Sequence, residues 1–106
     1  MQGLRVLIVG SGGREHTLAW KLSQSKNLGK LYCAPGNGGV RQLAECIPLK
    51  VDDIQGIVDF AKKELIDVVV VGPELPLTLG LVDALEAEGI KAFGPSRLAA
   101  EIEGSK

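Results

Sequence analysis

Short apolar runs alternate along the chain with segments in which apolar residues recur at helical spacing. The apolar runs, each bounded by turn residues, predict strands at residues 4–9, 30–34, 45–49, 67–71 and 90–93. The first and fourth runs are almost uninterrupted, which is typical of strands buried on both faces of a parallel sheet. Pro48 lacks the N–H that a sheet ladder needs, so the third strand is expected at an edge.

Helical spacing predicts helices at residues 14–25, 54–65, 76–88 and 96–103, with a single helical turn at 40–44. The sequence Asn-Leu-Gly at 27–29 is expected to end the first helix. The second has the clearest apolar face, made by Ile54, Ile57, Val58, Ala61 and Leu65. Asp52 or Asp53 can cap that helix. Pro76 suits the first turn of the third helix, and Gly89 is expected to end it.

Strands separated by helices imply right-handed parallel crossovers. We therefore expect residues 1–106 to form one α/β domain, an open, parallel, five-stranded Rossmann-like sheet of order 3-2-1-4-5 with helices on both faces. In this order the chain reverses direction between the first and fourth strands. Open sheets of this kind bind ligands outside the carboxyl ends of the strands at such a switch point.

A glycine-rich turn, Gly10-Ser11-Gly12-Gly13, joins the first strand to the first helix at this switch point. Backbone N–H groups and the positive end of a helix dipole converge in such a turn, and missing Cβ atoms allow a close approach, so it suits a phosphate. Arg14 can pair with that phosphate or can be a solvated surface charge. The simpler alternative is a tight turn without a ligand.

The dinucleotide fingerprint G-x-G-x-x-G is incomplete here, because Glu15 occupies the position of the third glycine. No acidic residue follows the second strand, where one would bind the ribose hydroxyls of a nicotinamide cofactor. A nucleotide- or NAD-binding Rossmann domain of an oxidoreductase is thus the second interpretation. A flavodoxin-like signalling domain is the third, although its phosphoacceptor aspartate has no counterpart at Val71-Gly72-Pro73.

Three further glycine or proline turns, at 35–39, 72–74 and 94–96, follow the second, fourth and fifth strands, so they are expected on the same edge of the sheet. In the second of these turns Glu74, after Pro73, can accept hydrogen bonds from two adjacent ribose hydroxyls, or can simply favour a helix start. Asn37 can contact a ligand or close its own turn. Glu15 can contact a ligand or act as a favourable charge in a first helical turn. His16 fits a solvated or packed helix residue better than a catalytic one.

Twelve basic and thirteen acidic residues give a net charge of −1, and the basic residues are scattered, which argues against a nucleic-acid surface. No apolar run has the length of a membrane span, and the first strand begins too early to leave room for a signal peptide. We therefore expect a soluble, cytoplasmic protein. Cys33 and Cys46 are expected to be reduced and structural, and with a single histidine the chain has too few ligands for a zinc site, so no metal is assigned.

The segments GSGGREHTLAWKL, APGNGG, VVGPELPLTLGLVDAL and FGPSRLAAEIEGSK together resemble the amino-terminal domain of the phosphoribosylamine–glycine ligase family, also called glycinamide ribonucleotide synthetase. The resemblance covers essentially the whole chain in order, and it departs from the expected alanine at Thr17. It implies a cytoplasmic ATP-grasp ligase that joins glycine to 5-phosphoribosylamine, with ATP and magnesium, to give glycinamide ribonucleotide in de novo purine biosynthesis.

The same resemblance implies that residues 1–106 are the substrate-binding, pre-ATP-grasp domain, with the ATP-grasp and carboxy-terminal domains absent from this chain. The ATP and magnesium sites would lie in those domains, which this domain would contact in cis, and no catalytic residue is expected here. The chain alone is therefore expected to be inactive. Its expected share is to hold the phosphate of 5-phosphoribosylamine or glycinamide ribonucleotide at residues 10–14 and the ribose at Glu74, with Pro73, Glu15 and Asn37 nearby.

Overall fold

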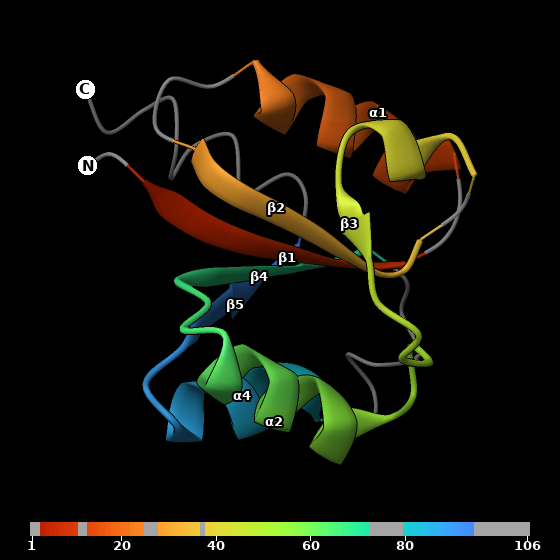
Figure 1. Ribbon diagram of the computed structural model, residues 1–106. Helices are drawn as coiled ribbons and strands as arrows, with labels where there is room; N and C mark the ends of the chain where they lie inside the picture. The colour runs from red at the N-terminus through yellow and green to blue at the C-terminus, as the bar shows by residue number, and fades with distance from the viewer. Residues whose placement is uncertain (1–2, 11–12, 25–27, 37, 73–79, 95–106) are drawn as a thin grey trace.

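The computed structural model describes residues 3–10, 13–24, 28–36, 38–72 and 80–94 (Figure 1). Five parallel strands form one sheet in the order β3-β2-β1-β4-β5, as predicted. The strands are β1 (Leu4–Gly10), β2 (Leu28–Pro35), β3 (Glu45–Cys46), β4 (Val68–Val71) and β5 (Lys91–Phe93). The helices are α1 (Gly13–Ser23), α2 (Ile54–Lys63) and α4 (Leu81–Ala87), with a 3₁₀ turn η1 (Val40–Gln42).

Helices cover both faces of the sheet: α1 and η1 lie on one side, α2 and α4 on the other (Figure 1). Successive side chains of β1 point to opposite faces of the sheet, so the core has two parts, one on each face. Val6 and Ile8 pack on the α1 face, whereas Leu7 and Val9 pack on the face of α2 and α4, and all four are fully buried. Burial of each such side chain contributes about 1.5–3 kcal/mol. The prediction that β1 is buried on both faces is confirmed.

The end of α2 differs from the prediction. Leu65 was expected on its apolar face, but the helix ends at Lys63, and Leu65 takes a left-handed φ of 55° with 75% of its surface exposed. The N–H of Ile66 donates to the carbonyl of Ala61 at 2.9 Å, and the N–H of Leu65 donates to Lys62 at 3.4 Å, which together form a Schellman ending. This ending reverses the chain and buries Ile66 in place of Leu65. At the other end, Asp53 rather than Asp52 caps the helix.

Three other predicted boundaries also move. β2 already begins at Leu28, so Leu28 and Gly29 belong to a strand instead of ending the first helix. β3 is an edge strand as predicted but stops at Cys46, because the N–H of Ile47 makes the last bond to β2, at 2.8 Å, and Pro48 has no N–H to continue. α4 starts only after Gly80, whose left-handed φ of 86° interrupts any helix running from 76 to 88. The predicted helix at 96–103 lies outside the described residues.

A polar cluster ties the end of α2 to the amino-terminal part of the sheet. The Arg5 guanidinium donates to the Glu64 carbonyl at 2.6 Å and to the Tyr32 hydroxyl at 2.9 Å. The Tyr32 hydroxyl donates in turn to the Glu64 carboxylate at 3.1 Å. Burial raises the pKa of Tyr32, and its hydrogen bond to Glu64 raises it further. The ring of Tyr32 also meets Phe60 edge-on, with 5.1 Å between ring centroids.

Candidate functional site

The carboxyl ends of β1, β2 and β4 are joined by backbone hydrogen bonds. The N–H of Gly36 donates to the carbonyl of Gly10, and the N–H of Gly72 donates to the carbonyl of Val9, each at 3.0 Å. These bonds continue the strand register, in which Gly10 pairs with Pro35, and Val9 with Val71. The residues that begin the predicted ligand-binding turns are therefore direct neighbours at the switch point.

The turn between β1 and α1 begins in a conformation suited to glycine. Gly10 has a φ of 148°, where a side chain would be strained, and α1 starts at Gly13, three positions later. The first N–H groups of α1 have no partner within the helix, and the dipole of its 11 residues places partial positive charge at the same point. Arg14 and Glu15 belong to this first turn of α1. The backbone here can bind an anion.

Other predicted site residues lie outside the described part of the chain: Ser11, Gly12, Asn37, Pro73 and Glu74. Their described neighbours Gly10, Gly36 and Gly72 are the residues that the backbone bonds bring together. His16 is exposed on α1. The assignment of individual ligand contacts therefore remains a prediction.

The sequence predicts two reduced, structural cysteines, and in the structure one of them reaches the switch point. The Cys33 thiol donates to the carbonyl of Gly10 at 3.4 Å, and Cys33 pairs in register with Cys46 of β3. The sequence holds a signal for this position, since Cys33 directly precedes the Ala34-Pro35-Gly36 end of the second strand.

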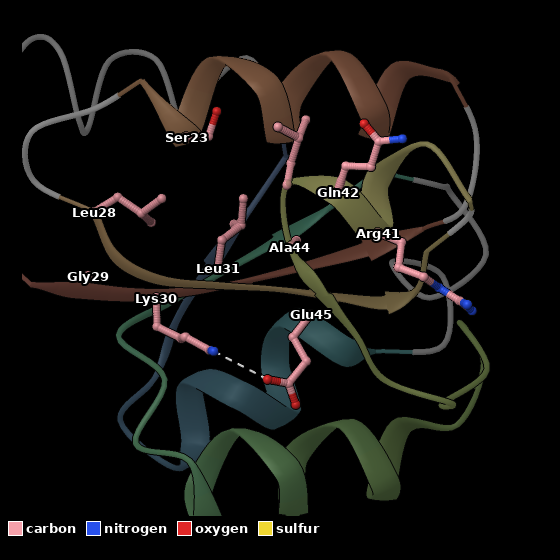
Figure 2. A pocket seen from close by; sticks show the side chains of 10 residues that line it. Ser23, Leu28, Gly29, Lys30, Leu31, Arg41, Gln42, Ala44 and Glu45 are labelled. Atoms are coloured by element: carbon pink, nitrogen blue, oxygen red, sulfur yellow. Dashed lines mark ion pairs between the residues drawn. The ribbon is translucent and has the colours of Figure 1, made fainter.

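A separate hollow of about 470 Å³ lies along the outer edge of β2, below the end of α1 (Figure 2). Lys30 and Glu45 point toward each other beside it, with 3.3 Å between Nζ and Oε1, and both side chains are about half exposed. The hollow is lined by the amino-terminal half of β2 and by residues 41–45. It is open, and it does not include the carboxyl ends of β1 and β4, so it is not the predicted ligand site.

Among the described residues, no group of three or more histidine, cysteine or acidic side chains is arranged to hold a metal ion. The Glu64 carboxylate accepts a hydrogen bond from the Arg5 guanidinium, and the Asp67 carboxylate accepts one from the backbone N–H of Arg5. Within the same residues, no helix has both the length and the apolar character to cross a membrane.

The sheet order and the adjoining strand ends define an open, parallel α/β domain of Rossmann-like order, with its switch point between β1 and β4. Residues 4–103 match the family described as phosphoribosylglycinamide synthetase, N domain, and the chain belongs to this family. Its fold class and the resemblance drawn from its motifs are thereby confirmed.

The curated proteins that this chain resembles share one name, phosphoribosylamine–glycine ligase. The chain is 58% identical to a phosphoribosylamine–glycine ligase of Brucella melitensis and 55% identical to one of Caldanaerobacter subterraneus, in each case over 97% of the chain. A ligase of the same name from Synechocystis is 53% identical. The chain spans about a quarter of the length of these curated relatives, which are covered to 24% or 25%.

Proposed function

We propose that this domain is the substrate-binding part of an ATP-dependent ligase that joins glycine to 5-phosphoribosylamine, giving glycinamide ribonucleotide in purine biosynthesis. Family membership supports the reaction, because similar proteins bear the ligase name over this same segment. The main support for the location of the site is the pair of backbone hydrogen bonds that join the carboxyl ends of β1, β2 and β4 at the switch point.

The phosphate of the substrate would bind at the turn of residues 10–14. This assignment is supported by the φ of Gly10 and by the start of α1 at Gly13, which directs N–H groups and the helix dipole toward the turn. Arg14, in the first turn of α1, would add a charge-assisted bond to the phosphate. Ser11 and Gly12 would complete the loop around the phosphate oxygens.

The ribose would then lie toward the carboxyl end of β4, where the N–H of Gly72 donates a hydrogen bond to the carbonyl of Val9. A sugar attached to the phosphate can reach this strand end, because β4 is a direct neighbour of β1 on the far side from β2. Glu74, two residues further on, would accept hydrogen bonds from adjacent hydroxyl groups. Pro73, Glu15 and Asn37 would line the same site.

The proposal places ATP and Mg²⁺ in the parts of the ligase that this chain does not span, in a cytoplasmic enzyme. When bound, they would supply activation of glycine as an acyl phosphate. This domain would present the amine-bearing substrate to them through contacts in cis with the ATP-grasp domain. Its own groups bind and orient the substrate and hold no catalytic role.

Amide chemical shifts of the 106-residue chain distinguish this function from an NAD-binding role. Ribose 5-phosphate should perturb the amides of Gly10, Gly36 and Gly72, whereas NADH at equal concentration should not. A reversed preference would favour the oxidoreductase interpretation. Perturbations confined to the hollow beside β2 would refute the site.

Glu74→Gln and Glu74→Ala in the full-length ligase test the ribose contact. A hydrogen bond to a charged group contributes about 1.5–3 kcal/mol, so kcat/KM for phosphoribosylamine should fall by roughly ten- to a hundredfold, while kcat/KM for ATP changes little. An exposed carboxylate of α2, Asp59, provides a matched control as Asp59→Asn. An equal fall in kcat/KM for both substrates, or no fall in a folded variant, would show that Glu74 does not bind the ribose and only favours the start of a helix.

A further inference from the structure

Two thiols occupy facing positions on neighbouring strands. Cys33 of β2 and Cys46 of β3 are register partners in a parallel pair, and both belong to the core on the α1 face of the sheet. Neighbouring strands lie roughly 4.8 Å apart, which falls within the separation of roughly 4.4–6.8 Å between Cα atoms that a disulfide spans. Both residues are thiols in this structure.

The backbone of Gly36 shows how closely the two side chains approach. A Cβ placed on Gly36 would lie 2.6 Å from the sulfur of Cys46 and 3.5 Å from the Cβ of Cys33. The Cys46 sulfur and the Cys33 side chain therefore border the same small space, and the absence of a side chain at Gly36 leaves room for the sulfur. The loop between the two strands begins at this point.

The two thiols differ in access to solvent. Cys33 is fully buried, whereas Cys46 is partly exposed on the edge strand. A dissolved oxidant would meet Cys46 first, and Cys33 would then act as the resolving thiol. The Cys33 thiol also donates to the Gly10 carbonyl, so a reaction at Cys33 removes a hydrogen bond from the start of the β1–α1 turn.

We propose that Cys33 and Cys46 are a modification site that low-molecular-weight disulfides, such as oxidised glutathione, convert into an intramolecular disulfide. The Cys46 thiolate attacks one glutathione sulfur, which forms a mixed disulfide and releases the first glutathione thiol. The Cys33 thiolate then attacks the Cys46 sulfur, which closes the protein disulfide and releases the second. Two electrons pass from the protein thiols to glutathione, and the two thiol protons pass to the released glutathione.

Oxidised glutathione added to the 106-residue chain at mildly alkaline pH tests the site, with intact-mass measurement over time. The expected product lacks both thiol hydrogens, carries no glutathione, and returns to the starting mass with dithiothreitol. Cys33→Ser should stop the reaction at the mixed disulfide on Cys46. Cys46→Ser should leave Cys33 unmodified while the chain is folded.

The unfolded chain in urea provides the matched comparison for the closure step. In the folded chain the register holds the thiols together, so closure should be roughly tenfold faster, or more, than in the unfolded chain. The Gly10 carbonyl resonance should also shift on oxidation, since it loses the thiol donor. Equal closure rates, a persistent glutathione adduct, disulfide-linked dimers, or an unchanged Gly10 resonance would each overturn the proposal.

Discussion

Alkaline pH should destabilise this domain, and one identifiable part of the loss should come from Tyr32. In the unfolded chain a tyrosine ionises near pH 10, whereas in the folded chain burial and the hydrogen bond to Glu64 raise the pKa of Tyr32. Below pH 10 both states keep the proton, and stability is fully present. Between the unfolded and the folded pKa, only the unfolded state loses it, so the free energy of unfolding falls by about 1.4 kcal/mol per pH unit.

The composition makes this measurement specific. Tyr32 is the only tyrosine, so tyrosinate absorbance of the native chain reports this one hydroxyl. Urea unfolding between pH 8 and 11 gives the stability, and Tyr32→Phe is the control, since it keeps the ring contact with Phe60 but has no proton to lose. The difference between the two stability curves removes the contribution of lysine titration.

The size of the Tyr32→Phe effect at neutral pH follows from the same cluster. The hydroxyl makes one bond with Arg5 and one with Glu64, so its loss should cost about 1–2 kcal/mol. The Arg5–Glu64 ion pair contributes little by itself, because the two side chains are 37% and 31% exposed. Native tyrosinate formation near pH 10, or parallel stability curves for the two proteins, would refute the reasoning.

Three further outcomes are expected. Gly12→Val should weaken phosphate binding, measured by calorimetry, with helix content by circular dichroism unchanged; an unchanged affinity would remove residues 10–14 from the site. The 106-residue chain should release no ADP in a coupled assay, because the proposed ATP site lies in parts of the ligase that this chain does not span; activity above a buffer blank, in material free of the intact ligase, would contradict this. Gly56→Ala should destabilise the domain, because the added Cβ would lie 2.7 Å from the carboxylate carbon of Asp53, which caps the helix. In an Asp53→Ala background the same substitution should stabilise the domain by up to about 1 kcal/mol. An effect of the same sign in both backgrounds would disprove the steric clash.

The sheet order was predictable because the central strands β1 and β4 are apolar runs and because helical segments separate most of the strands. The position of the switch point followed from that order alone. Element ends were less predictable, since they depend on backbone bonds between distant residues. Leu65 fits the helical period, yet the need to enter β4 at Val68 imposes a left-handed residue there and turns its side chain to solvent.

Part of the candidate site could not be predicted from the hydrophobic periodicity of the sequence. The glycine turns were found because glycine and proline mark chain reversals at strand ends. The proximity of Cys33 to Gly10 depends on the register between β1 and β2, which shifts between Leu4 and Arg5. Similarly, no local pattern links Arg5 to Tyr32 and Glu64, because the three residues belong to separate elements that meet only after folding.

The short length of β3 has a consequence for how the domain behaves at high concentration. β3 pairs only with Tyr32 and Cys33, so among the described residues no strand lies beside 28–31 on that side of β2. An uncovered strand edge is a template for pairing with a second chain. Lys30 and Glu45 stand at this edge, 3.3 Å apart and exposed, and an incoming strand would have to desolvate both charges. This ion pair therefore contributes little to folding but opposes aggregation of one folded domain with another.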